Sequence, residues 1–287
     1  MKAVCIAQVV VTASLWLCAS PAEAQNAASA SADVQAPVAP AKPAEAPAAP
    51  GPVDVPVPLK PVEAVEKKLL EWSMFDFQYL YGFNWDLGPK RKDILTLEHA
   101  DGWKLGDNYL FVDVMHLTNQ DAPTGFYGEW QPRLSLSKIF GLNLNTGLLH
   151  DILETNRLAF GDGFLAYLVG AAVDLNVPGF AYWHQHFFVR SDTQLGGSTW
   201  QVTTEWAVPI EIGPVRFVQD GFVHFIGAEG KSSLNIITQP QLLLDVGNFA
   251  GYKDQLFVGA EVDLRYNEYG IKGQNEAVPQ AMVEWKL

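Results

Sequence analysis

The sequence predicts an all-β fold, a transmembrane antiparallel β-barrel of about twelve strands. Three observations lead to this prediction: repeated segments in which apolar and polar residues alternate, turn residues between these segments, and a final alternating segment at the end of the chain. A barrel in lipid turns apolar side chains outward and polar side chains toward its lumen, which produces segments of about ten alternating residues. After the first two dozen residues there is no apolar run of about 18 residues, so no transmembrane helix is expected.

The first 24 residues have the features of an export signal. Lys2 is followed by a mostly apolar stretch over residues 3–17, and small residues precede an expected cleavage site after Ala24. The apolar stretch is shorter than the roughly 20 residues that a membrane-spanning helix needs. Both cysteines, Cys5 and Cys18, lie within this segment, so we expect a mature chain without disulfides, thiolate metal ligands or cysteine nucleophiles.

Residues 25–71 form an Ala/Pro-rich segment that we expect to be an unstructured leader or linker in the periplasm. Proline fixes φ and removes a backbone donor, so such a segment is extended and does not build a core. Residues 62–71 could add two or three helical turns. A periplasmic spacer or a plug at the barrel mouth is the alternative. The barrel itself is expected to comprise residues 72–287.

The alternation is clearest in residues 126–137, 200–212 and 255–266. In residues 200–212, for example, Trp200 and Val202 share one face of a strand, while Gln201 and Thr203 share the other. Turn residues rich in Gly, Pro and Asn separate such segments. Twelve strands are predicted, centred on Phe75–Trp85, Ile94–His99, Tyr109–His116, Tyr127–Ser137, Leu142–Leu149, Phe164–Leu175, Phe180–Arg190, Trp200–Ile212, Val215–Ile226, Leu234–Val246, Leu256–Tyr266 and Val278–Leu287.

The end of the chain favours a membrane barrel over a soluble β-sandwich, which could share its 48% hydrophobic and 12% aromatic content. Val283 and Trp285 alternate with Glu284 and Lys286, and outer-membrane barrels end in an amphipathic strand that the barrel-assembly machinery reads. Leu287 replaces the usual terminal aromatic residue. An even number of strands places both termini on one side, the periplasm. We therefore expect the outer membrane of a Gram-negative bacterium.

Several strings carry a more specific resemblance. They occur in order along the barrel: EHADGW with GDN (98–108), YGE with PRLS (127–135), GDG (161–163), DLNVPGF (174–180), STWQVT (198–203), TQPQLLLD (238–245) and VPQAMVEW (278–285). The ordered set resembles the nucleoside-specific channel family of the outer membrane, Tsx and its OmpK relatives. The resemblance implies a twelve-stranded monomeric pore for nucleosides and deoxynucleosides, and some members also serve as phage receptors.

The inward faces of the predicted strands give a candidate lumen lining. Its polar and aromatic members are Glu98, Tyr109, Phe111, Asp113, Tyr127, Glu129, Arg133, Tyr182, Phe188, Arg190, Glu205, Phe222, Glu261 and Arg265. A nucleoside base stacks on aromatic rings with roughly 1–3 kcal/mol per base, and its ribose hydroxyls need polar partners. The lining therefore indicates a narrow pore with stacking rings. The alternative is an interior packed for structural reasons, as in small barrels, and for Glu129 with Arg133 we prefer this structural pairing.

The charge balance narrows the choice of partners. A net charge of −13 argues against nucleic acid, and it favours cations or neutral solutes over nucleotides. Two classes of function remain open. The first is a channel for nucleosides or similar small polar solutes. The second is a general small-solute pore or a structural or phage-receptor barrel without solute selectivity.

Other chemistry has little support in the sequence. His184 and His186 share one face of a strand, but no third ligand stands at a recognisable spacing, so we predict a lumen pair without a metal. Ser135 and Ser137 lie near no histidine motif, and the glycines of residues 161–163 have turn spacing without a P-loop lysine. We expect no enzyme activity and no cofactor.

Overall fold

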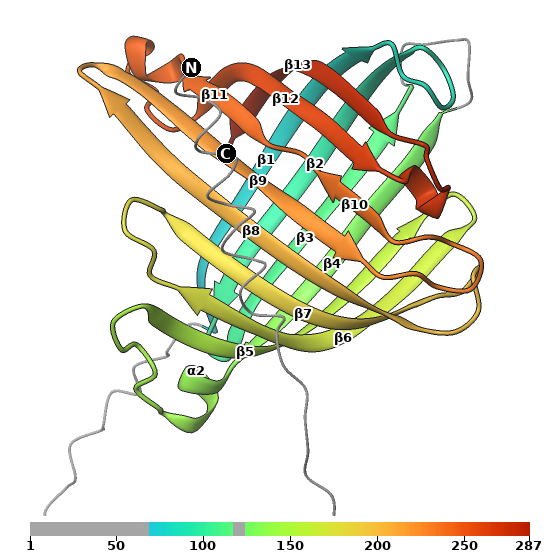
Figure 1. Cartoon of the computed structure of the whole chain (residues 1–287). Helices are drawn as coiled ribbons and strands as arrows, with labels where there is room; N and C mark the ends of the chain where they lie inside the picture. The colour runs from blue at the N-terminus through green and yellow to red at the C-terminus, as the bar shows by residue number, and fades with distance from the viewer. Residues whose placement is uncertain (1–68, 117–123) are drawn as a thin grey trace, which may run out of the picture. The chain divides into compact units, whose positions relative to one another are not determined.

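The computed structural model describes residues 69–116 and 124–287, in which strands pair in series and close into one antiparallel barrel (Figure 1). Consecutive strands pair with each other around the wall, except that β10 and β11 do not pair together, and the last strand, β13, pairs with the first, β1. The strands are β1 (Leu70–Phe83), β2 (Arg91–Trp103), β3 (Gly106–Met115), β4 (Gly125–Ser135), β5 (Leu149–Gly161), β6 (Phe164–Leu175), β7 (Tyr182–Asp192), β8 (Thr199–Ile212), β9 (Val215–Ile226), β10 (Asn235–Thr238), β11 (Gln241–Asp245), β12 (Leu256–Tyr266) and β13 (Glu276–Lys286).

Strands β10 and β11 are two halves of one interrupted strand, because both pair with β9 on one side and β12 on the other. The break falls at Gln239 and Pro240, and a proline has no N–H for the ladder. Gly221 of β9 lies against the break with φ of 144°, and an added Cβ would approach the Gln239 carbonyl oxygen to 2.7 Å. The barrel therefore has twelve strand positions, which confirms the predicted fold class and strand number.

Side chains alternate between the two faces of the barrel wall. In β1, Asp76, Gln78 and Leu80 are buried, whereas Tyr79 and Tyr81 are exposed. The buried face is the interior, because its side chains meet across strands that are not neighbours: Arg157 of β5, for instance, contacts strand β8. Exposed aromatic and aliphatic residues cover the outside, as expected of a barrel in lipid. Polar side chains predominate inside, beside two small apolar clusters: Leu80, Leu243, Phe257 and Met282, and Ala159, Ala166, Leu168 and Phe188.

The barrel has two ends, which we name after their short helices. The α2 end carries α2 (Leu136–Phe140), the start of β1, the end of β13 and the 3-10 helix η1 (Gly247–Ala250); the η2 end carries η2 (Glu268–Gly270) (Figure 1). Among the described residues, no helix is long and apolar enough to cross a membrane. The predicted signal and nearly all of the predicted leader lie outside the described residues.

One predicted strand, Leu142–Leu149, is wrong. Those residues form the connection after α2, and the fifth strand is instead Leu149–Gly161. The error has a physical cause, because β5 places Glu154 and Asn156 on its outer face and Leu153 on its inner face, which breaks the expected alternation. The predicted strand Tyr127–Ser137 also ends early, since the Ser135 hydroxyl accepts a hydrogen bond from the Lys138 N–H and caps α2.

Candidate functional site

The structure places all fourteen candidate lining residues on the inner face of the barrel. The strand registers put them in facing pairs and rows: Glu98 opposite Phe111, Phe111 opposite Glu129, and Asp113 opposite Tyr127. Farther round the wall, Glu205 is opposite Phe222. The remaining members of the set follow the same parity: Tyr109, Arg133, Tyr182, Phe188, Arg190, Glu261 and Arg265.

Arg157 of β5 is the centre of a charged network inside the barrel. Its side chain is 2% exposed, and its guanidinium lies 2.9 Å from Glu129 Oε2 and donates to Glu205 Oε1 at 2.6 Å. It also donates to the Gln131 side-chain oxygen and lies 3.4 Å from His224 Nε2. Strands β4, β5, β8 and β9 therefore converge on one buried cation, which fixes the side chains on this side of the interior.

The preferred pairing of Glu129 with Arg133 is wrong. Arg133 forms a bidentate pair with Asp107 at 2.6 and 2.8 Å and a further ion pair with Asp174 at 2.8 Å. Glu129 instead takes Arg157 as its partner. The two residues are on one strand face, but the four residues of strand between their positions span about 13 Å. Asp107 instead stands directly opposite Arg133 in the β3–β4 register.

The part of the wall formed by β1–β3 and β11–β13 is acidic. Tyr109 donates to Glu98 and Thr96 donates to Asp113, both at 2.6 Å. Glu261 accepts from the Gln241 and Gln280 side chains at 2.9 and 2.8 Å. Arg265 forms a bidentate contact with Asp263 at 2.8 and 2.9 Å. Glu98, Asp113 and Glu261 are thus held by neutral donors, whereas Asp263 pairs with Arg265 and Glu284 lies 3.2 Å from Lys286.

Two ladders of aromatic rings run along the inner face. The first comprises Tyr109, Phe111, Tyr127 and Phe164 of β3, β4 and β6, with successive ring centroids 5.9, 5.9 and 6.0 Å apart. The second follows β7 through Tyr182, His184, His186 and Phe188, with successive centroids 4.8, 6.2 and 5.6 Å apart. Both ladders lie beside the charged network: the Arg157 guanidinium lies 5.4 Å from the Phe188 ring centre. The interior therefore offers π-faces next to charged hydrogen-bonding groups.

Two further candidates complete the lining. Phe222 packs against His224 with ring centroids 4.4 Å apart. Arg190 donates to the Gln201 side-chain oxygen at 3.1 Å and lies 5.7 Å from the Phe164 ring centre. These contacts connect the first aromatic ladder to strands β7 and β8.

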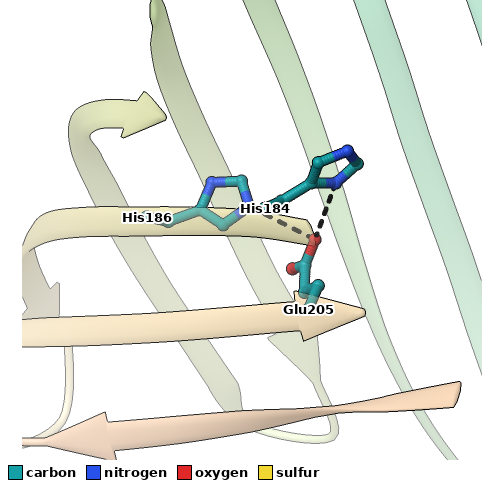
Figure 2. Close-up of side chains that lie close together, drawn as sticks. All are labelled: His184, His186 and Glu205. Atoms are coloured by element: carbon teal, nitrogen blue, oxygen red, sulfur yellow. Dashed lines mark hydrogen bonds and ion pairs between the residues drawn. The ribbon is translucent and has the colours of Figure 1, made fainter. Parts of the chain in front are cut away.

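The two histidines of β7 lie next to a carboxylate that the sequence did not indicate as their partner. Glu205 of β8 faces both imidazoles: His186 Nε2 is 3.2 Å and His184 Nδ1 is 3.8 Å from its Oε2 atom (Figure 2). His184 also borders a cavity of about 170 Å³ at the α2 end of the barrel, together with His150, Asp174 and Tyr182.

Sequence reasoning missed the central residues Arg157, Gln131 and His224. Arg157 was overlooked because β5 was not predicted as a strand. His224 and Gln131 have the same parity as the predicted residues Phe222 and Glu129, so a strict count by twos along those strands could have found them.

Comparison with known proteins gives weak likenesses only. Neither a protein-family model nor a curated protein sequence matches this chain. Among solved structures, the chain is similar to the KdgM porin in complex with disordered oligogalacturonate, with 11% identity, a TM-score of 0.44 and coverage of 74% of this chain and 98% of that one. It is also similar to the outer membrane protein Omp33 of Acinetobacter baumannii, with 11% identity, a TM-score of 0.38 and coverage of 76% and 98%. At these scores the likenesses carry no weight about what this chain binds.

Proposed function

We propose that this chain is an outer-membrane channel for small polar solutes and that nucleosides are its preferred solute class. The observation that carries the proposal is the pair of aromatic ladders on the inner face, next to carboxylates, amides and guanidinium groups. The resemblance to the nucleoside-specific channel family agrees with this choice. The proposal includes a monomeric barrel that is folded by the assembly machinery, with the leader in the periplasm.

A nucleoside matches this lining in both of its parts. Its base has an apolar face that stacks on a ring such as Phe111 or Tyr127, with roughly 1–3 kcal/mol per base. Its ribose hydroxyls both donate and accept, so Glu98, Gln131 and similar side chains can bind them. Weak contacts repeated along a ladder let a solute enter and leave, as conduction requires.

The charge of the interior favours neutral or cationic solutes over phosphorylated ones. Carboxylates outnumber cations on the β1–β3 and β11–β13 wall, where Asp76, Glu98, Asp113 and Glu261 face the interior. The phosphate of a nucleotide is repelled by these groups, and the low dielectric of a narrow lumen strengthens the repulsion.

The proposal is tested by swelling of liposomes that contain the purified barrel. We expect adenosine and other nucleosides to enter faster than sugars of similar size, and adenosine monophosphate to enter more slowly than adenosine. Equal rates for adenosine and its monophosphate would refute the electrostatic part. Equal rates for adenosine and a sugar would leave a general small-solute pore.

A closed barrel is the second candidate, and the packing of the central network favours it. Arg157 is 2% exposed, and Thr203 and His186 of the same region are fully buried. A barrel with such an interior would act through its outer loops, as a structural element or a phage receptor. Swelling would then be absent for every solute, including nucleosides.

A further inference from the structure

We propose that His184, His186 and Glu205 form a binding site for a divalent transition-metal ion such as Zn²⁺ inside the barrel. Each offers one ligand atom, and the three atoms lie within 4.8 Å of one another (Figure 2). Two imidazoles and one carboxylate are a ligand set that suits zinc and leaves a position free for water or a solute.

Two of the three distances between ligand atoms are close to those that zinc needs, and the third, between the two histidines, is at most 4.8 Å. Ligand atoms at the corners of a tetrahedron, each about 2.0–2.1 Å from zinc, lie about 3.3 Å apart. His186 Nε2 and Glu205 Oε2 are 3.2 Å apart, and His184 Nδ1 and Glu205 Oε2 are 3.8 Å apart. The strand register holds this arrangement, because His184 stands directly opposite Glu205 and His186 follows two residues later on the same face.

The groups around the three ligands orient them for an ion. Arg157 holds Glu205 Oε1 at 2.6 Å, which leaves Oε2 directed at both histidines. On the other side, Asp174 Oδ2 lies 3.7 Å from His184 Nε2, the ring nitrogen that does not face Glu205. This distance is longer than a hydrogen bond, and closing it on metal binding would give the carboxylate–imidazole contact that selects the tautomer a metal needs.

The local charge also favours a cation. Two guanidinium groups, those of Arg133 and Arg157, are shared among four carboxylates: Asp107, Glu129, Asp174 and Glu205. An ion can reach the site through the interior, since His184 and Glu205 are partly exposed and His184 borders the 170 Å³ cavity at the α2 end.

Alternative roles for these residues are weaker. A structural hydrogen bond explains His186 and Glu205, but it leaves His184 Nδ1 at 3.8 Å from Glu205 Oε2, beyond hydrogen-bonding range. Mg²⁺ is a poor occupant, because it prefers oxygen ligands in octahedral geometry. The site therefore distinguishes borderline transition ions from the abundant hard cations.

The test is calorimetric titration of ZnCl₂ into the purified, detergent-solubilised full chain without a polyhistidine tag. We expect one Zn²⁺ per chain, with no competition from excess Mg²⁺. The double variant H184N/H186N should bind at least 100-fold more weakly, because loss of a ligand exceeds the 10–100-fold typical of a lost outer-shell partner. His99, which faces outward beside Ser73, provides the matched control H99N, and its binding should be unchanged.

Three results would overturn the proposal: no zinc binding, zinc binding that the double variant retains, or equal loss in H99N. If the double variant fails to fold, as judged by its heat-modifiable electrophoretic mobility, the variant E205Q keeps a side chain of the same shape and decides the question by the same titration. Calorimetry measures binding whether or not the barrel conducts, so the result is independent of the proposed channel function.

Discussion

Replacement of Arg157 by methionine should destabilise the barrel more than any change to a surface ion pair. The variant removes a cation that is 2% exposed and leaves Glu129 and Glu205 without their guanidinium partner. Breaking a buried pair by removing one member costs about 3–5 kcal/mol, because the other charge stays buried. Glu129 keeps the Tyr127 hydroxyl at 2.6 Å, and Glu205 keeps His186 at 3.2 Å. We therefore expect a loss near the lower limit, about 3 kcal/mol.

The assay is reversible denaturant unfolding in detergent micelles or phospholipid vesicles, followed by tryptophan fluorescence. Lys90 provides the control, since its side chain is 68% exposed and lies 3.7 Å from Asp86. The variant K90A should lose less than about 1 kcal/mol. Adding E129Q to R157M removes one orphaned charge and should restore roughly 1–2 kcal/mol. A loss below about 1 kcal/mol in R157M, or no recovery in the double variant, would refute the central role of Arg157.

Three further predictions concern other parts of the barrel. The first is that F111A interrupts the first aromatic ladder and removes one stacking partner, worth roughly 1–3 kcal/mol. Adenosine binding should therefore weaken by at least fivefold in titrations of the purified barrel. Unchanged affinity would exclude that ladder from the binding path. The second concerns Glu268, in the loop between β12 and β13. Burial raises the pKa of Glu268 from 4.5 to about 7; the nearby Arg265 lowers this pKa, and the neighbouring Glu276 raises it. The folded loop then holds a proton that the unfolded chain releases, so this stabilisation is complete below pH 4.5 and is lost as the pH rises through about 7. Thermal unfolding should show E268Q more stable than the native chain at pH 8, on the order of 1 kcal/mol, and no gain at pH 8 relative to pH 4 would contradict the assignment. The third is G170A, in which the new Cβ would lie 1.9 Å from the Phe187 carbonyl oxygen. The resulting strain, about 1–3 kcal/mol, should lower the yield of folded barrel on refolding. A yield equal to that of the native chain would show that β6 and β7 can move apart without an energetic cost.

The sequence predicts the faces of the strands better than their partners. Alternation depends on each strand alone, so residues such as Glu98, Phe111 and Glu261 could be placed on the inner face from their parity. The bonds that these side chains form depend on the register between strands and on contacts across the interior. The pairing of Arg133 with Asp107 and Asp174 spans three strands, β3, β4 and β6. No spacing along one strand indicates such a set.

The same limit applies to the metal site proposed above, whose third ligand the sequence did not indicate. His184 and His186 are visible as a pair on one face, but Glu205 lies 19 residues after His186, on the next strand. Only the β7–β8 register brings it opposite His184.

The missed strand β5 has a different cause. Glu154 and Asn156 lie on its outer face, where the Asn156 side chain donates a hydrogen bond to Glu154 at 2.5 Å, so that each polar group has a local partner. A prediction that assigns every polar residue of a strand to the lumen therefore fails where two polar residues on the outer face form a hydrogen bond with each other.

The central claim, a barrel interior that passes and recognises nucleosides, is tested most directly by single-channel conductance in planar bilayers. Purified barrel is inserted, and the current is recorded during titration with adenosine and, separately, with glucose. We predict small conductance steps that adenosine blocks in a saturable manner and that glucose leaves unchanged. The absence of channels, or steps that respond equally to both solutes, would contradict it.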